Sequence, residues 1–303
     1  MGSDLLFSKK SRSDPLLRRR AEWLASLPTI AWLGLFVVIP TALVFAVAFR
    51  PATPYGGIGP GWTLDTLRTL AAPGTLAIAW RTLWISALTT ALSLALALPV
   101  GYTIARAPAR WRNTLLLLVI IPFWTSFLVR VFAWRSLLHP EGPVKRALVA
   151  LGLVGPEATL LYNPAAVVLV MVYTFLPFTI LPIYAAAEKF DFRLVEAARD
   201  LGARPFQAFR RVFLPGIKRG VLTAVLVVLI PALGSYIIPD LVGGPSGEML
   251  GNKIAQRVFT DRNLPQAAAL SAVLVLAVLG PLVAVLWLQR RGKKSEIVMG
   301  EAP

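Results

Sequence analysis

The sequence predicts an all-α membrane protein, a bundle of six transmembrane helices with both ends of the chain in the cytoplasm. Hydrophobic residues make up 56% and charged residues only 15% of the 303 residues, and the mean hydropathy is +0.68. Soluble domains average about 45–50% apolar and about 25% charged residues. A soluble fold of this length could not bury so much apolar surface, so lipid is the expected solvent.

Six mostly apolar runs are long enough to cross a bilayer, which takes about 20 residues in a helix. These runs do not alternate as strands do, and lipid tolerates only helices or closed barrels. We expect the six helices at residues 28–49, 76–104, 114–138, 164–187, 221–241 and 265–288. Prolines inside the runs predict kinks, and Pro122 and Pro231 are the strongest candidates for kinks that line a path through the membrane.

The first run follows a basic stretch, as the core of a secretory signal peptide does. A signal core spans only about 7–15 apolar residues, whereas residues 28–49 are enough to cross the membrane. The tripeptide Ala46, Val47 and Ala48 imitates a cleavage site, so processing is the alternative. We expect an uncleaved first helix behind a basic cytoplasmic tail at residues 1–27.

Charged residues fall within or at the ends of the second, third and fifth runs. Arg81, Arg130, Arg135 and Asp240 all map toward the outer ends of their helices. Charges in a membrane are functional candidates by default, although an arginine near a helix end can also reach the headgroups. Arg130 is the better candidate for a translocation path because it follows an aromatic stretch, and an ion pair between Asp240 and one of the arginines is a hypothesis.

The distribution of basic residues predicts the orientation of the helices. Alternating the loops between two sides places roughly three times as many lysines and arginines on the side of the two termini. Cytoplasmic loops carry such an excess, and an even number of helices agrees with it. We therefore expect a transmembrane domain at residues 28–288, a cytoplasmic C-terminal tail at 289–303, and an irregular outer loop at 50–75.

The cytoplasmic segment 191–215 is highly charged and nevertheless patterned. Apolar residues follow helical spacing from 192 to 201, and Gly202 is suited to the left-handed conformation that ends a helix. Pro205 can begin a second short helix, to which Phe206, Phe209 and Phe213 would give an aromatic face. The segment is either an amphipathic hairpin on the lipid surface or a docking helix for a cytoplasmic partner.

The chain lacks the residues that several classes of function require. The chain has no cysteine and a single histidine, His139 in a loop, which argues against zinc and iron–sulfur sites. It has no phosphate-binding Gly-x-x-x-x-Gly-Lys-Ser/Thr loop and no set of nucleophile, base and orienting group, so we expect no enzyme. The net charge is +16, but most of the basic residues lie between the apolar runs. This distribution is typical of residues that determine membrane topology, and it disfavours nucleic acid as a partner.

The 191–215 segment resembles the EAA loop of binding-protein-dependent ABC importer permeases. The resemblance rests on Glu196, Ala197, Ala198, Gly202, Val212, Leu214 and Pro215. The family pattern favours isoleucine at position 212, which is a mild departure. In that family the loop is the coupling helix that sits in a cleft of the ATPase subunit. The resemblance therefore implies ATPase coupling by Glu196, Ala197, Ala198, Asp200, Leu201, Gly202, Leu214 and Pro215.

Three further stretches resemble the spermidine/putrescine permeases of that family. They are PFWTSFLVRVFAW at 122–134, LPFTILPIY at 176–184 and IPALGSYIIPDLVGGP at 230–245. A polyamine site should offer carboxylates and aromatic faces. On this basis the tentative substrate path comprises Trp124, Ser126, Arg130, Tyr173, Tyr236 and Asp240. The nearby arginines conflict with a polycation, so another small organic solute is the alternative cargo.

The resemblance also implies a fold, a mechanism and partners. The fold would be the type I (MetI-like) importer permease, and transport would proceed by alternating access in the bacterial inner membrane. No cofactor would be bound by this chain, because ATP and magnesium belong to a separate cytoplasmic ATPase dimer. The other partners would be a second, homologous permease, a solute-binding protein and membrane lipid. A secondary transporter is the less favoured class, since the sequence shows no duplicated halves and few intramembrane acids.

Overall fold

The computed structural model describes the backbone of residues 26–300 and the side chains of residues 26–280, 282 and 283. Within this part the chain is helical, with one isolated β-bridge, between Ala52 and Ile58, and no strand. The predicted tails at 1–27 and 289–303 lie almost entirely outside the described side chains. The helical class predicted from the apolar runs is confirmed.

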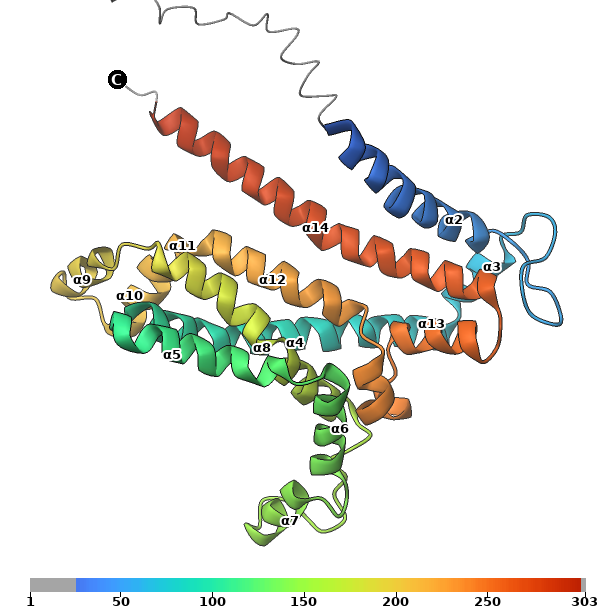
Figure 1. The fold of residues 1–303 in the computed structure, drawn as a ribbon, viewed down its shortest axis with the longest axis horizontal. Helices are drawn as coiled ribbons and strands as arrows, with labels where there is room; N and C mark the ends of the chain where they lie inside the picture. Colours follow the sequence, from blue (N-terminus) through green and yellow to red (C-terminus); the bar gives the residue numbers. More distant parts are fainter. Residues whose placement is uncertain (1–25, 301–303) are drawn as a thin grey trace, which may run out of the picture.

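The helices follow one another in the order α2 to α14, with short π and 3₁₀ turns (η) between them (Figure 1). The first half contains η1 (Gly34–Val38), α2 (Ile39–Ala48), α3 (Asp65–Arg68), η2 (Thr69–Ala71), α4 (Pro73–Arg106), α5 (Ala109–Ile120), η3 (Ile121–Trp124), α6 (Phe127–Leu138) and α7 (Pro143–Ala150). The second half contains α8 (Pro164–Glu188), α9 (Arg193–Asp200), α10 (Pro205–Ala208), η4 (Phe209–Phe213), α11 (Leu214–Gly216), α12 (Lys218–Leu233), η5 (Pro239–Gly243), η6 (Pro245–Gly247), α13 (Leu250–Phe259) and α14 (Leu264–Gly300).

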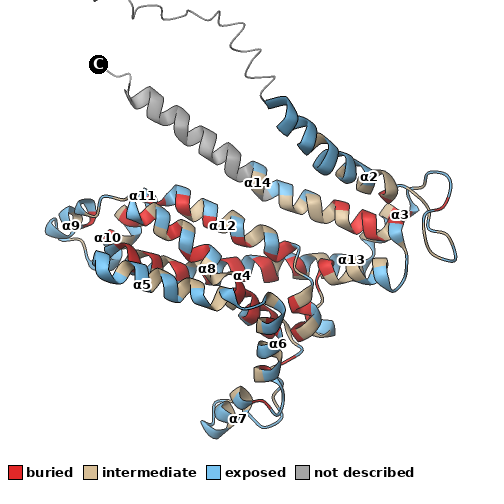
Figure 2. Ribbon diagram, viewed as in Figure 1, coloured by how far each residue is buried: buried red, intermediate tan, exposed pale blue. Residues whose placement is uncertain are grey.

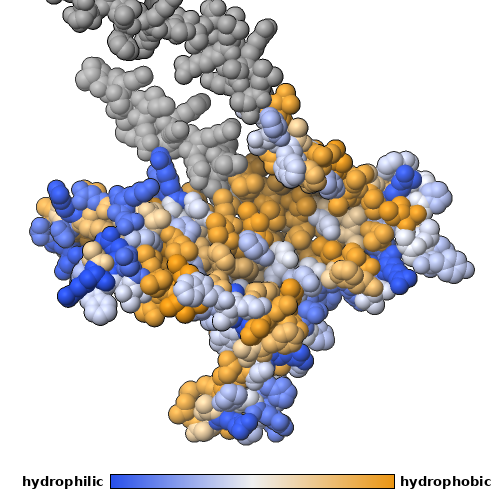
Figure 3. All heavy atoms as spheres, in the orientation of Figure 1, coloured by the Kyte–Doolittle hydropathy of each residue, from blue (hydrophilic) through white to orange (hydrophobic). Residues whose placement is uncertain are grey.

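Three helices, α4, α8 and α12, form the centre of the bundle, and α5 lies beside them (Figure 1). Buried residues gather along the facing sides of these three helices (Figure 2). Helix α14 packs on α2, α12 and α13, and the α2–α14 pair is set apart from the centre. On the face shown in Figure 3, hydrophobic side chains cover much of the middle, and hydrophilic ones gather toward the α9–α10 end and the α3–α13 end. This banding is what a protein crossing a bilayer requires.

Three described helices are long and apolar enough to cross a membrane, and the number is five if each sharply bent pair counts as one span. The three are Ser26–Ala48, Pro73–Arg106 and Pro164–Glu188. A shorter apolar helix, Leu264–Gly280, occupies the sixth predicted run. The six apolar runs therefore all contain helix, while the count of six spans stays a prediction.

The third predicted helix, 114–138, is wrong as a continuous element. The chain bends by 86° between Ala109–Trp124 and Phe127–Ala150, so α6 and α7 leave the bundle (Figure 1). Pro122 lacks the N–H that would continue the backbone ladder, and Thr125 takes an extended conformation with ψ 152°. The Thr125 hydroxyl donates to the Pro122 carbonyl at 2.8 Å, which satisfies a backbone acceptor that the break leaves free.

The fifth predicted helix, 221–241, also ends early. Helix α12 stops at Leu233, and the chain continues as η5 from Pro239. Gly243 and Gly244 allow this turn to lie against α8: a Cβ at Gly243 would come within 2.8 Å of Val167, and Gly244 has φ +58°. The chain between α12 and α13 thereby becomes an irregular wall at the α3–α13 end. The predicted outer loop 50–75 also contains the short helices α3 and η2.

Candidate functional site

The 191–215 segment forms two short helices, as the sequence predicts. The Asp191 carboxylate accepts from the Arg193 N–H at 3.0 Å, next to the start of α9. Gly202 ends that helix with φ +89°, in the left-handed region that glycine adopts without steric cost. Helix α10 then begins at Pro205, and the side chain of Gln207 accepts from the Arg204 N–H at 3.0 Å.

An aromatic cluster joins this segment to the end of α4. The Tyr102 ring lies 5.6 Å from Phe192, 5.5 Å from Phe209 and 4.9 Å from Phe213, in edge-on geometry each time. Phe190 adds contacts at 5.5 Å to Phe192 and 5.4 Å to Phe213. Edge-to-face pairs contribute about 0.5–1.5 kcal/mol each beyond their burial. The segment is therefore held firmly against the bundle on one side.

The predicted aromatic face of the second helix is partly wrong. Phe213 is fully buried and Phe209 is half-buried, but Phe206 is 71% exposed. The cause is the π-helical turn η4, Phe209–Phe213, whose wider spacing shifts the side chains off the α-helical face. Phe206 is instead left on the free surface, together with Leu201, which is 89% exposed.

The predicted coupling residues divide between the free surface and the contact with the bundle. Glu196, Ala197, Asp200, Leu201, Gly202 and Pro215 are exposed. Ala198 and Leu214 are half-buried. Glu196 pairs with Arg106 at the end of α4, with 3.5 Å between Oε1 and Nη2, and the Arg106 guanidinium lies 5.7 Å from the ring centres of both Tyr102 and Phe192. An open hollow of about 610 Å³ at this surface is lined by Glu196, Arg199, Asp200, Gly202, Ala203, Arg204 and Pro205.

A second hollow lies at the opposite end of the molecule, between η5 and α13. Its volume is about 670 Å³, and it is open to one side. The lining comprises Tyr236, Pro239, Asp240, Gly244, Pro245, Glu248, Asn252, Lys253, Ala255, Gln256, Phe259 and Thr260. We call it the η5–α13 cavity. Its lining contains two carboxylates, two aromatic rings and two amide side chains.

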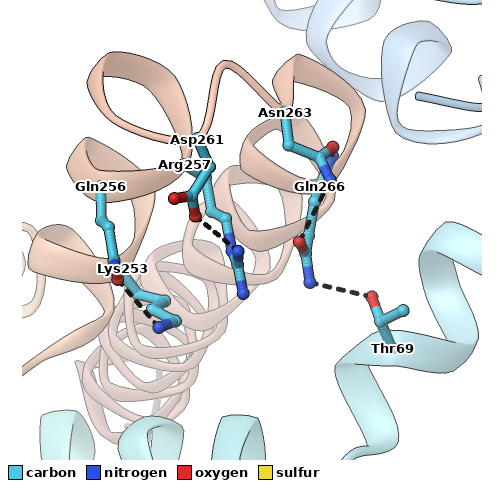
Figure 4. A network of polar contacts seen from close by, with 7 residues as sticks. All are labelled: Thr69, Lys253, Gln256, Arg257, Asp261, Asn263 and Gln266. Atoms are coloured by element: carbon cyan, nitrogen blue, oxygen red, sulfur yellow. Dashed lines mark hydrogen bonds and ion pairs between the residues drawn. The ribbon is translucent and has the colours of Figure 1, made fainter. Parts of the chain in front are cut away.

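Hydrogen bonds fix the polar groups of the η5–α13 cavity. Asn252 donates to the Tyr236 carbonyl at 2.9 Å and to the Asp240 carboxylate at 3.5 Å. Lys253 Nζ donates to Gln256 Oε1 at 2.9 Å, along α13 (Figure 4). Neither Asp240 nor Glu248 takes part in an ion pair with any residue whose side chain is described. Both carboxylates are therefore available to an incoming cation.

The end of α13 and the start of α14 are braced just beyond the cavity. Arg257 forms an ion pair with Asp261, and Asn263 contacts Gln266, which reaches Thr69 of η2 (Figure 4). This bracing connects the α13–α14 turn to the N-terminal end of α4, because η2 leads directly into that helix.

Helix α4 supports the rim of the η5–α13 cavity. Arg81 Nη1 donates to the Pro245 carbonyl at 2.9 Å and to the Glu248 carbonyl at 3.4 Å. The Thr82 hydroxyl accepts from the Leu250 N–H at 2.8 Å. The hypothesis of an ion pair between Asp240 and an arginine is therefore wrong among the described residues, since Arg81 binds carbonyls and Asp240 binds Asn252.

The structure brings together only two of the six predicted path residues. Tyr236 and Asp240 line the cavity, but Trp124, Ser126, Arg130 and Tyr173 do not. Trp124 is 76% exposed at the break before α6, with Ser126 beside it. The Arg130 guanidinium lies 4.3 Å from the centre of the Phe123 ring.

Tyr173 is half-buried within α8 and packs edge-on against Trp134 at 5.3 Å. The sequence analysis did not predict Glu248, Asn252 and Phe259, which also line the cavity. The spacing of Asn252 and Gln256, four residues apart, is the signal that could have marked one polar face of a helix.

Residues 97–293 match the family described as "Binding-protein-dependent transport system inner membrane component". The chain belongs to this family. The matched region begins inside α4, contains the 191–215 segment and the η5–α13 cavity, and ends inside α14. The members are permease components of transport systems, so the family assigns the chain to transport and to the inner membrane.

Curated relatives in this family cover most of the chain. The spermidine/putrescine transport system permease protein PotB of Haemophilus influenzae is 36% identical over 80% of this chain and 84% of the relative. PotB of Escherichia coli K12 is 33% identical over 88% of this chain and 98% of the relative. The inner membrane ABC transporter permease protein YdcU of the same organism is 31% identical over 87% and 84%.

Solved structures support the family fold. A bacterial ABC transporter that imports the acidic polysaccharide alginate aligns with a TM-score of 0.70 at 19% identity, covering 92% of this chain and 97% of its own. The MetNI methionine ABC transporter aligns with a TM-score of 0.55 at 22% identity, covering 73% and 98%. At these identities the alignments establish the architecture of an ABC importer permease.

Proposed function

We propose that this chain is the transmembrane permease subunit of an ATP-driven importer that carries a polyamine, putrescine or spermidine, into the cytoplasm. The observation that carries the proposal is the similarity to PotB, at 33–36% identity over most of both chains. The proposed topology is six transmembrane helices with both termini in the cytoplasm, which puts the η5–α13 cavity at the outer face of the membrane.

The chemistry of the η5–α13 cavity suits a flexible polycation. Asp240 and Glu248 supply two carboxylates, and the rings of Tyr236 and Phe259 are 45% and 78% exposed beside them. Aromatic faces attract ammonium groups through their quadrupole, by about 0.5–2 kcal/mol. Lys253 is the one basic residue of the lining, and its ammonium group is directed to Gln256.

The arginines conflict less with a cationic cargo than their positions in the sequence imply. Arg81 donates to the carbonyls of Pro245 and Glu248, and Arg135 approaches the Tyr162 hydroxyl at 3.5 Å. Arg130 lies over Phe123 and outside the cavity. These contacts support a cavity whose lining has two carboxylates against a single ammonium group, that of Lys253.

The energy for transport would come from a separate ATPase dimer that binds ATP and magnesium. The exposed part of the 191–215 segment, with Leu201 and Phe206 on its surface, would dock on that dimer. Nucleotide binding would close the dimer, pull this segment, and alternate the access of a central path between the two sides. A second, homologous permease and an external solute-binding protein complete the proposed assembly.

Reconstituted transport tests the proposal. The complete complex in proteoliposomes should take up labelled putrescine or spermidine only when ATP and the solute-binding protein are both present. An excess of the unlabelled polyamine should abolish the uptake. If uptake depends on ATP but neither polyamine competes with it, the chain would still be an importer permease. Its cargo would then be another small organic solute. Uptake without the ATPase subunits would indicate a secondary transporter instead.

A further inference from the structure

Helix α4 extends from the 191–215 segment to the rim of the η5–α13 cavity. It contains 34 residues without interruption, from Pro73 to Arg106, which at 1.5 Å per residue is about 51 Å. Figure 1 shows it running beneath α12 from the α13 end to the α9–α10 end. Both candidate functional regions therefore contact one continuous helix.

The inner end of α4 is built into the aromatic cluster. Tyr102 contacts three phenylalanines of the 191–215 segment at 4.9–5.6 Å, and Arg106 adds an ion pair to Glu196. The rings are close-packed, so a displacement of the segment is transmitted to Tyr102 by contact. Next to Tyr102, a Cβ at Gly101 would lie 2.7 Å from Ile183 of α8, so the helix has no free space there to absorb the displacement.

The outer end of α4 holds the chain on both sides of Glu248. Arg81 binds the carbonyls of Pro245 and Glu248, while Thr82 accepts from Leu250. Only glycine fits at this point of the rim, because Gly244 has φ +58° and a Cβ added there would lie 2.8 Å from Tyr162. The orientation of the Glu248 carboxylate therefore depends on the position of α4.

We propose that α4 is the link that converts movement of the 191–215 segment into movement of the η5–α13 cavity rim. Tyr102 and Arg81 are its positioning residues at the two ends. Pro99 lies inside α4, close to the inner end, and the helix continues through it to Arg106. The inference rests on the proposed function, because it requires that the segment is moved by a nucleotide-driven partner.

A single cysteine on the rim can report the movement. The chain has no native cysteine, and Ser246 is exposed on the rim but does not line the cavity. The Ser246→Cys chain, assembled with its ATPase, is labelled with a membrane-impermeant maleimide with and without ATP plus vanadate. The inference predicts that the labelling rate changes between the two conditions.

Variants at the two ends of α4 then test the link. Arg81→Ala and Tyr102→Leu, each in the Ser246→Cys background, should abolish the nucleotide dependence of labelling and lower uptake roughly tenfold, within the usual range of coupling between sites. Arg81→Lys, which can keep one bond to the rim, should retain part of it. Tyr102→Phe, which keeps the ring but loses the hydroxyl that accepts from Arg106 at 2.9 Å, should also retain part of it. The matched control is Arg68→Ala, which removes an exposed arginine that pairs with Asp65 outside both regions.

Co-purification of the ATPase with each variant is the readout that separates this inference from the proposed function. An assembled Arg81→Ala chain whose rim still responds fully to nucleotide overturns the link. A parent Ser246→Cys chain whose labelling ignores nucleotide overturns it as well, even if uptake requires ATP. A chain that never binds an ATPase contradicts the proposed function itself.

Discussion

At the scale of single residues, Gly202 sets the direction in which the chain leaves α9. Its φ of +89° belongs to the left-handed region, and no atom lies within 4 Å of the place where a Cβ would be. The requirement for glycine there is therefore purely one of backbone conformation. The sequence alone identifies this cap, because a glycine that follows a helical pattern has few other roles.

Replacing Gly202 should weaken the docking surface without any steric clash. We expect Gly202→Ala to cost about 1–2 kcal/mol of local stability, the penalty of a left-handed L-residue. The amount of ATPase that co-purifies with the permease should fall accordingly. Gly155→Ala is the matched control, because Gly155 also has open space around it but has no positive φ. Equal retention of the ATPase by the two variants would contradict the role assigned to Gly202.

The two cavity carboxylates should set the apparent affinity for a polyamine. Asp240→Asn or Glu248→Gln each removes a charge-assisted contact worth about 1.5–3 kcal/mol, so the KM for uptake should rise about tenfold or more. Glu157→Gln is the control, since Glu157 is exposed in the loop after α7 and does not line the cavity. Uptake by the proteoliposomes over a concentration series measures the KM, and an unchanged KM in both cavity variants would remove the cavity from the cargo path.

At the scale of elements, run length and composition predicted where the helices are but not where they break. The runs 76–104 and 164–187 closely match α4 and α8, since continuous apolar sequence of that length has no alternative in lipid. The break at Thr125 depends on how a hydroxyl and a proline cooperate, and average hydropathy contains no such information.

The same reasoning explains why most of the cavity lining was not predicted. Tyr236 and Asp240 fall inside a predicted helix and were found, whereas Glu248, Asn252 and Phe259 follow it. Helix α13 has only 10 residues, too few to register in a search for spans of about 20. Its position over the cavity depends on the turn at Gly243 and Gly244 and on contacts from Arg81, which are separated widely in the sequence.

The close crossing of α8 and α12 supplies a test of packing. A Cβ at Gly220 would lie 2.3 Å from the Ala186 Cβ and 3.0 Å from the Pro182 carbonyl oxygen. We expect Gly220→Ala to destabilise the bundle by about 1–3 kcal/mol, the usual cost of overpacking. Thermal unfolding in detergent measures the loss. Gly34→Ala is the control, because Gly34 lies in open space on the first helix, and it should leave the transition temperature unchanged. A Gly220→Ala variant with the transition temperature of the parent would contradict the close packing of α8 and α12.

At the scale of the whole molecule, the orientation that the charge asymmetry predicts has a direct test. Tyr55 is 97% exposed in the 50–75 loop, and Leu201 is 89% exposed in the 191–215 segment. In intact cells an impermeant thiol reagent should label Tyr55→Cys and spare Leu201→Cys. Leu201→Cys should react only after permeabilisation. The reverse pattern would place the docking segment outside, where no ATPase could reach it.

The hydroxyl-bearing face of α4 has a consequence for how the bundle can move. Ser86, Thr89 and Ser93 are fully buried, and their hydroxyls have no partner among the described residues. Thr90 shows the alternative open to such groups, since it donates to the Ser86 carbonyl of its own helix at 2.7 Å. No side-chain bond from these three residues pins α4 to its neighbours. If the bundle rearranges during transport as proposed, no side-chain hydrogen bond from these three residues has to break, and each hydroxyl can turn back to a carbonyl of its own helix.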